Sequence, residues 1–574
     1  MKHLFLRKTH LIKLSMSMFI ILLSSQSYAF WGYQPSLLKT ISDGKIQGTE
    51  DNYNTHVFKG IPYAAAPIND LRWRAPQDVT PWEGVRDTTE FGSVCAQTGT
   101  FWGTDKPEEF ATAIGSEDCL FMNVWRPNNY KKNLPVLLWI HGGSNSRGSG
   151  SFDAYNGAHL ASNANAVVIT INFRLGAFGW AYNSFTDNGD PEDASGNYAL
   201  LDMIKSLEWV QNNIREFGGN PRKVTIAGNS SGCGAVWGLM HSPLANDLFH
   251  RAICSGGGPG GLSAEVGQLI SDSLIDSLLV GMGLAPDLAS AASYRQSQGD
   301  AWVADFMRSI PAEILANAVP RSPSNYIDGY VIPELSLESI EAGAYNQVPM
   351  IIGSTKNETT MILGFLAGFF NGTSASSPLL WDQLNSDPNT LSATDIINPS
   401  IYPLYAGIED AFSYAWNLSI DNSAANARKH NPQIFRYDFE WDNVPAPWDE
   451  ALGATHTLDL PFMFGNFITD KDNVHKFAWT EDNKASRETL SDQFMKYIAR
   501  FMRTGNPNAG WGLPRWKRWN TTSHTHLNTK ILLDDPIQGS SEQKNYEEFE
   551  QMLLDLDPTS KSIVESLTQG MWLQ

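Results

Sequence analysis

Residues 224–232 read VTIAGNSSG, an apolar run that ends in a Gly-x-Ser-x-Gly motif. A buried strand that enters this motif and is followed by small residues is typical of a nucleophile elbow. Gly228 and Gly232 permit so sharp a turn that the hydroxyl of Ser230 stands exposed at the strand's carboxyl end. A serine held there, at a helix N-terminus and within reach of a base, can attack a carbonyl carbon. The motif with its flanks predicts Ser230 as a nucleophile; without them an ordinary turn would be the better interpretation.

Other runs are apolar on both faces, which indicates buried strands of a mainly parallel sheet. They cover residues 136–140, 166–172, 252–257, 350–353 and 434–437. Between two of these strands, apolar positions in residues 198–217 recur at helical spacing, and a Gly-Gly-Asn-Pro stop follows. Strand, helix and strand in that order form a crossover unit. The pattern predicts an α/β fold with a large, mostly parallel central sheet flanked by helices.

A second glycine motif, HGGS at residues 141–144, follows the strand at 136–140. Glycines there allow backbone N–H groups to approach a ligand closely and to stabilise the oxyanion of a tetrahedral intermediate. The alternative is a plain Gly-Gly turn, and His141 on its own is more typical of a packed histidine than of a catalytic one.

A serine nucleophile needs a base and an acid that orients it, and in this fold they follow in the order serine, acid, histidine. Glu358 comes shortly after the strand at 350–353, at the edge where such sheets carry their chemistry. The histidines beyond it are His430, His456, His475, His524 and His526. Only His456 lies in a small-residue loop that precedes an apolar run, but spacing alone leaves the choice open.

The net charge of the chain bears on whether it could bind nucleic acid. The chain of 574 residues carries 41 Lys and Arg against 61 Asp and Glu, a formal net charge of −20. Such a surface repels phosphate backbones, which argues against nucleic acid as a partner. No Cys or His cluster has the spacing of metal ligands, and His524 with His526 has no further ligand nearby. We therefore expect neither a metal nor a cofactor.

The first 29 residues resemble a secretory signal. Basic residues precede a short apolar run at 14–23, and Ser-Tyr-Ala stands at 27–29. The run is shorter than the roughly 18 apolar residues that span a bilayer. We expect cleavage near Ala29, export to the periplasm or beyond, and no stable membrane span. No linker, charge block or repeat divides residues 30–574, which predicts a single domain.

With these pieces assembled, the chain resembles the type-B carboxylesterase (cholinesterase-like) family of α/β-hydrolases, and is close to bacterial exported carboxylesterases. The resemblance runs from about residue 44 to residue 516. It is carried by FKGIPYA at 58–64, SEDCLFMNV at 116–124, NFRLG at 172–176, GGNP at 218–221 and RTGNPN at 503–508. It implies the α/β-hydrolase fold, with helical insertions around 258–332 and 359–426 that form a gorge over the site.

The resemblance also implies roles for particular residues. It makes Ser230, Glu358 and His456 the catalytic triad, and it puts the oxyanion donors at the backbone N–H groups of Gly143, Ser144 and Ser231. It suggests a disulfide between Cys95 and Cys119, and structural ion pairs Arg72–Glu117 and Arg174–Asp202.

The remaining cysteines, Cys233 and Cys254, flank the elbow and the next strand. They form either a second disulfide that braces the elbow or a pair of buried thiols.

Three positions depart from the family pattern. Asn229 stands where the family usually has Glu, which removes a negative charge that could attract a cation by on the order of 1–4 kcal/mol. Ser144 replaces a glycine of the oxyanion loop, so its backbone freedom falls. Trp102 is not at the distance from Cys119 expected of the family's cation-binding tryptophan. Asn229 therefore favours neutral esters over choline esters, and Ser144 is expected to reshape the oxyanion hole.

The sequence thus predicts an exported serine hydrolase that cleaves small neutral esters, of short to medium chain or aryl type, through an acyl-enzyme. A non-catalytic recognition module of the same fold, or a lipase or amidase on the same site, is the alternative. Phe365, Phe369, Phe370 and Trp381 are candidates for the gorge wall, although ordinary packing explains any one of them. Short stretches rich in small residues, such as 287–297, are expected to be loops.

Overall fold

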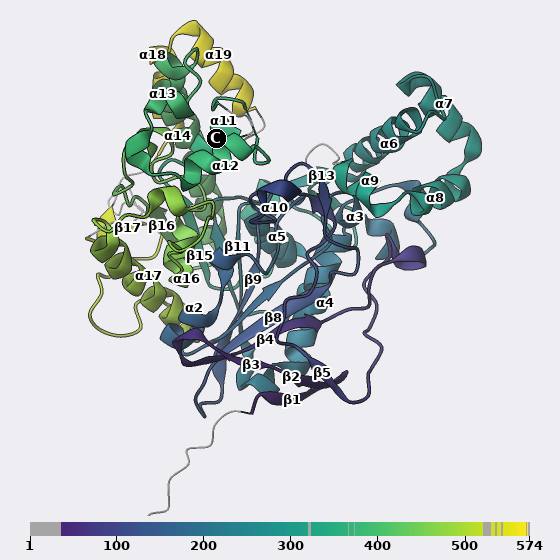
Figure 1. The fold of residues 1–574 in the computed structure, drawn as a ribbon, viewed down its shortest axis with the longest axis horizontal. Coiled ribbons are helices and arrows are strands. Elements are labelled where there is room, and N and C mark those ends of the chain that lie inside the picture. The colour runs from purple at the N-terminus through teal and green to yellow at the C-terminus, as the bar shows by residue number, and fades with distance from the viewer. Residues whose placement is uncertain are drawn as a thin grey trace, which may run out of the picture.

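A sheet of 11 strands runs through the computed structural model (Figure 1). Its strand order is β18-β17-β16-β15-β12-β11-β9-β10-β8-β4-β3. The structure describes residues 36–318, 323–365, 367–371, 374–519, 530–533, 536–540, 544–569 and 571. The predicted signal peptide lies outside these residues, as do His524 and His526.

The middle of the sheet is parallel, as the apolar runs predicted. Its edges are antiparallel. The parallel strands are β9 (Leu134–Ile140), β10 (Val167–Ile171), β11 (Gly219–Asn229), β12 (Arg251–Ser255), β15 (Met350–Thr355), β16 (Ile434–Phe439) and β17 (Lys530–Leu533). The antiparallel strands are β3 (Thr49–Asp51), β4 (Thr55–Pro62), β8 (Phe121–Pro127) and β18 (Gln538–Ser540). A separate small sheet joins β1 (Leu38–Ile41), β2 (Gly44–Gln47) and β5 (Val85–Asp87).

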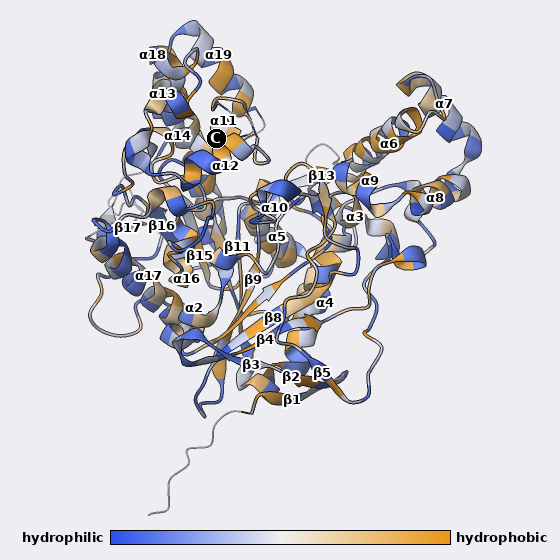
Figure 2. Cartoon of the chain, viewed as in Figure 1, coloured by the Kyte–Doolittle hydropathy of each residue, from blue (hydrophilic) through white to orange (hydrophobic). Residues whose placement is uncertain are grey.

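Helices cover both faces of the sheet, and alternate residues of each strand therefore enter two different hydrophobic cores. On β9, Leu137 and Trp139 join one core, whereas Val136 and Leu138 join the other. The first core includes residues of α2 (Ala158–Ala164), α16 (Asp459–Phe464) and α17 (Lys484–Thr504), and the second includes residues of α4 (Tyr198–Asn213) and α5 (Ser231–His241). The long helix α14 (Tyr402–His430) contributes to both cores. Figure 2 shows the central strands as mostly hydrophobic and the outer helices as mixed.

Two groups of helices rise beyond the carboxyl ends of the parallel strands (Figure 1). One group, from the 258–332 segment, contains α6 (Ala264–Gly281), α7 (Leu288–Gln298), α8 (Asp300–Ser309) and α9 (Ala312–Asn317). The other contains α11 (Thr360–Phe365), α12 (Pro378–Asn385), α13 (Ala393–Ile396) and the N-terminal part of α14, together with α18 (Tyr546–Asp555) and α19 (Pro558–Leu567). The last two helices were not anticipated as part of this layer.

The expectation of a loop at 287–297 is wrong, because α7 occupies these residues. The side chain of Asp287 caps the helix by accepting a hydrogen bond from the backbone N–H of Ser290. The alanines and polar residues of α7 are compatible with a helix. The small residues of this stretch were therefore interpreted as a loop, although they form a capped helix.

Covalent and ionic links fasten the elements around the sheet. Disulfides join Cys95 to Cys119 and Cys233 to Cys254, with Cα atoms 4.9 and 4.7 Å apart. The second bond ties α5 to β12. Both predicted ion pairs are present: Arg72–Glu117 and Arg174–Asp202 each have an N–O distance of 2.6 Å.

The Arg174–Asp202 pair gives a stability prediction, because Asp202 is completely buried. Arg174→Met should lower the free energy of unfolding by about 3–5 kcal/mol, since it leaves a buried carboxylate without its counter-ion. Lys205→Met is the control, because the partner Asp78 is 91% exposed; its effect should stay below about 1 kcal/mol. Urea unfolding measures both, and equal losses would contradict the assignment.

Candidate active site

Ser230 occupies a sharp turn between β11 and α5. Its backbone is left-handed, with φ 58° and ψ −126°, a strained conformation for a residue with a side chain. A Cβ atom added to Gly228 would lie 2.3 Å from the carbonyl oxygen of Gly232, and one added to Gly232 would lie 2.3 Å from that of Ile140. Only glycine fits at these two positions, as the elbow motif predicted.

Glu358 and His456 form a buried pair. The carboxylate oxygen Oε2 lies 2.5 Å from Nδ1 of the imidazole, and Oε1 accepts a hydrogen bond of 2.7 Å from the backbone N–H of Thr355. Glu358 is completely buried and His456 is 7% exposed. Because Glu358 engages Nδ1, the other imidazole nitrogen, Nε2, remains for a further partner.

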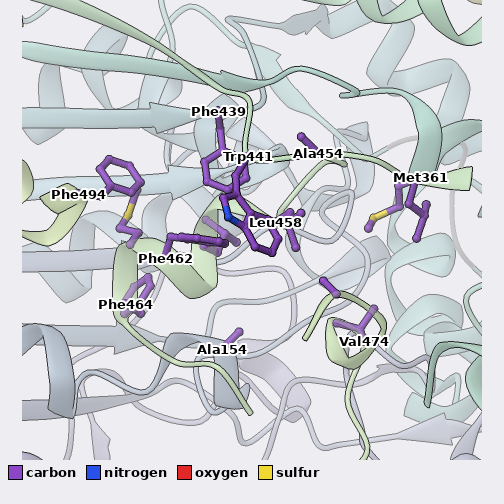
Figure 3. Close-up of a cluster of buried hydrophobic side chains, with 14 of the residues drawn as sticks. Ala154, Met361, Phe439, Trp441, Ala454, Leu458, Phe462, Phe464, Val474 and Phe494 are labelled. Carbon is purple, nitrogen blue, oxygen red and sulfur yellow. The ribbon is translucent and has the colours of Figure 1, made fainter. Parts of the chain in front are cut away.

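Asn357 holds the two loops of this pair together. Its backbone N–H donates to the carbonyl of Ala454, and its side-chain Oδ1 accepts from the N–H of the same residue, both at 3.1 Å. Ala454 and Leu458, which precede and follow His456 in the sequence, belong to the first hydrophobic core, and Figure 3 shows them with other members of it such as Trp441. The His456 loop is therefore fixed by hydrogen bonds to the Glu358 loop and by a rigid apolar floor.

The electrostatics of the pair favour a charged imidazole. Burial by itself lowers the pKa of His456, but the charge of Glu358 and its hydrogen bond outweigh burial, so the pKa is raised above 6.5. A histidine can accept a proton from a reacting group and return it later in the same reaction.

Residues at the end of β12 bring this pair close to the elbow. A Cβ atom on Gly256 would lie 2.7 Å from Cε1 of His456, and one on Gly257 would lie 2.6 Å from the carbonyl oxygen of Ser230. Ser230 and His456 both line one cavity of about 390 Å³. The Ser230 hydroxyl donates no hydrogen bond to a described residue, so its contact with Nε2 is not formed here.

The predicted oxyanion donors lie around the same turn. Gly143 and Ser144 line the cavity, and Ser231 is the first residue of α5. Across the described part of the chain, none of their three backbone N–H groups has an acceptor. Ser144 adopts a left-handed φ of 55°, which costs a residue with a side chain about 1–2 kcal/mol.

The other described histidines have different surroundings. His141 is buried, stacks on Phe173 at 4.3 Å, and burial lowers its pKa to about 4. His475 is buried without a carboxylate partner, and burial lowers its pKa to about 3. The Nε2 atom of His430 contacts the carbonyl of Glu341, away from the cavity. Of the described candidates, His456 alone pairs with Glu358.

A second buried acid was missed by sequence reasoning. Asp459 accepts hydrogen bonds from the hydroxyls of Ser255, at 2.5 Å, and Tyr437, at 2.6 Å. Burial raises the pKa of its carboxyl group, although the two hydroxyls oppose that change. The side chain of Asn229 donates to the carbonyl of Ser255 at 3.3 Å and so joins the same network. The only sequence signal that could have identified Asp459 is its position three residues after His456.

Most of the cavity wall is apolar, and it comes from three parts of the chain. The 359–426 segment and the C-terminal residues supply Met361, Ile362, Phe365, Ala375, Phe412, Trp416, Leu567 and Met571. Trp102 adds a wall from the loop between Cys95 and Cys119. Phe369, Phe370 and Trp381 belong to the first hydrophobic core and not to the wall. The 258–332 segment supplies no described lining residue, although Pro323 nearby accepts a hydrogen bond from Asn145 of the HGGS loop.

The described residues contain no group of three or more His, Cys, Asp or Glu that could hold a metal ion. Nor does any helix within the described ranges combine the length and apolar character needed to cross a bilayer.

A larger cavity of about 630 Å³ lies beside residues 103–115 and 466–475, and Ser230 does not line it.

The chain is similar to known proteins over most of its length. The profile described as "Carboxylesterase family" matches residues 35–548. Para-nitrobenzyl esterase of Bacillus subtilis (strain 168) is 29% identical over 88% of this chain and 97% of its own length. Fumonisin B1 esterase of Sphingopyxis macrogoltabida is 36% identical over 75% of each chain. A solved structure titled PNB esterase superposes with a TM-score of 0.68 at 27% identity, over 90% of this chain and 99% of that one.

The contact between Gly256 and the imidazole gives a second prediction. Gly256→Ala should lower the free energy of unfolding by about 1–3 kcal/mol, because the new methyl group would overlap a buried ring and φ is +59°. Gly260→Ala is the matched control, since nothing lies within 4 Å of its added Cβ. Denaturant unfolding of the two variants compares them, and a Gly256→Ala variant as stable as the control would refute the close contact.

Proposed function

The chain belongs to the carboxylesterase family and is a carboxylic ester hydrolase, and we propose that it works through an acyl-enzyme formed on Ser230. The observation that carries this proposal is the buried Glu358–His456 pair, which shares a cavity with a strained, elbow-borne serine. Serine alone is a weak nucleophile, and the adjacent base supplies what it lacks.

The proposed reaction has two halves. In the first, Nε2 of His456 takes the hydroxyl proton while Ser230 Oγ bonds to the ester carbonyl carbon; the alcohol then leaves with that proton. In the second, water gives a proton to His456 and attacks the acyl group, and Ser230 recovers its proton as the acid departs. Glu358 holds Nδ1 so that Nε2 faces the reaction, and it stabilises the imidazolium.

The negative charge that develops on the carbonyl oxygen is assigned to the N–H groups of Gly143, Ser144 and Ser231. Their lack of other acceptors among the described residues supports this assignment, because such donors are ready before the charge appears. The left-handed backbone of Ser144 supports it further, since strain of this kind gathers at functional turns.

The proposed substrates are small esters, of short to medium chain or aryl type, and not choline esters. The cavity of about 390 Å³ and its apolar wall suit such molecules. No Asp or Glu side chain is among its described lining residues, and Asn229 is neutral, so no carboxylate there attracts a cation.

We further propose that the protein is exported after cleavage near Ala29. The leader-like pattern of residues 1–29 supports this, and so do two disulfides, which persist mainly in oxidising compartments.

Ser230→Ala should reduce kcat for p-nitrophenyl acetate by at least about 1,000-fold, because the covalent intermediate can no longer form. Ser231→Ala tests the neighbouring hydroxyl, which accepts a hydrogen bond from the N–H of Asn145; its kcat should stay within about tenfold of wild type. Steady-state kinetics with background subtraction decide the matter, and equal rates for wild type and Ser230→Ala would end the proposal.

Glu358→Gln should move the acidic limb of the pH profile of kcat/KM to lower pH. The carboxylate raises the pKa of His456, and its loss leaves burial to lower that pKa, so the base stays neutral in more acidic solution. The rate itself should fall by about 1,000- to 10,000-fold.

Glu409→Gln is the matched control, because its side chain keeps an oxygen for the amide of Asn357 but does not touch His456. Its acidic limb should remain where wild type has it. A limb that stays in place or rises in Glu358→Gln would contradict the assigned roles.

A further inference from the structure

The active-site cavity contains one full positive charge that the proposed reaction does not use. Arg147 lines the cavity together with Ser230 and His456. The described lining has two other ionisable side chains. One is His456, and the other is Tyr155, a buried phenol whose pKa is raised by burial. In a chain with an excess of acidic residues, the described lining of this cavity thus includes an arginine and no carboxylate.

No acidic group neutralises Arg147 in the described structure. Among the described residues, the one hydrogen bond of its side chain runs from Nε to the hydroxyl of its neighbour Ser146, at a long 3.5 Å, and the guanidinium forms no ion pair. Arg72 and Arg174, by contrast, are each paired with a carboxylate, that of Glu117 and that of Asp202. Burial lowers the pKa of Arg147, yet a guanidinium stays protonated at neutral pH.

The position of Arg147 relates it to the reacting centre. Its backbone N–H donates to the carbonyl of Gly143 at 3.1 Å, so it closes the turn that carries the proposed oxyanion donors. A Cβ atom on Gly143 would lie 3.0 Å from Cγ of Arg147, which shows that the side-chain stem runs against that glycine. The guanidinium is thus anchored within one side-chain length of the oxyanion loop.

We propose that Arg147 binds a carboxylate of the substrate, and that the enzyme prefers esters carrying such a group over neutral esters of equal size. This rests on the proposed role of Ser230 and narrows its substrate class. A guanidinium presents paired N–H donors that match a carboxylate, and an apolar wall strengthens the attraction relative to water. The carboxylate can belong to the acid part or to the alcohol part of the ester.

The experiment compares charged and neutral esters of matched size. For the acid part, the probes are the mono-p-nitrophenyl ester of glutarate and p-nitrophenyl hexanoate. For the alcohol part, they are the butyryl ester of 4-hydroxybenzoate and phenyl butyrate. The readout is the ratio of kcat/KM for the charged ester to that for its neutral match, after subtraction of buffer hydrolysis, because this ratio cancels general losses of activity.

Arg147→Met removes the charge and keeps the stem, and it should lower the ratio by at least about tenfold in one arm. The arm that responds identifies the part of the ester that bears the carboxylate. Arg147→Lys should retain part of the preference, because it keeps the charge without the paired donors. Lys132→Met is the charge-matched control: Lys132 is exposed at the opposite end of β9, and the ratio should not change.

Ratios in Arg147→Met within about twofold of wild type in both arms would overturn the inference. If Arg147→Met does not fold, Arg147→Gln is judged by the same ratios. Failure of the proposed function looks different: Ser230→Ala would then hydrolyse the neutral esters as fast as wild type, whatever Arg147 does.

Discussion

The close approach of backbone segments at the carboxyl ends of β9, β11 and β12 is the constraint on which the site depends. Gly228 and Gly232 let the elbow turn beneath the HGGS loop, and Gly256 lets the imidazole of His456 rest against the end of β12. At each point a single methyl group would collide with backbone or with a ring. The sheet brings these ends together in register, and the missing side chains allow contact.

Burial gives the charged groups at the site their properties. Glu358 is shielded from water, and the N–H of Thr355 and the imidazole occupy its two oxygens. Asp459 lies nearby, and the hydroxyls of Ser255 and Tyr437 both donate hydrogen bonds to its carboxylate oxygen Oδ2. The charges of Glu358 and Asp459 therefore bias the imidazole of His456 toward its protonated form, against the effect of burial.

Features that depend on local sequence could be predicted, and features that depend on packing between distant segments could not. The parallel strands were predictable because a strand buried on both faces is apolar throughout. The elbow was predictable because its sharp turn requires glycines at fixed positions around the serine. Spacing left five histidines open as the partner of Glu358, and only the family resemblance selected His456. The contact that decides it, from Asn357 to Ala454, joins loops nearly a hundred positions apart.

Arg147 was overlooked for a related reason. Its sequence position beside the HGGS motif was visible, but whether a nearby acid neutralised it depends on the whole fold. The helices α18 and α19 were missed because their amphipathic pattern indicates a helix and not the surface it covers.

The reach of α19 into the cavity bears on enzyme engineering. Leu567 ends this helix, Met571 follows it, and both side chains meet the substrate space from outside the central sheet. The helix packs on α14, with Val564 completely buried beneath it. A library confined to Leu567 and Met571 would vary the cavity wall that these two residues form while leaving every strand and the elbow untouched.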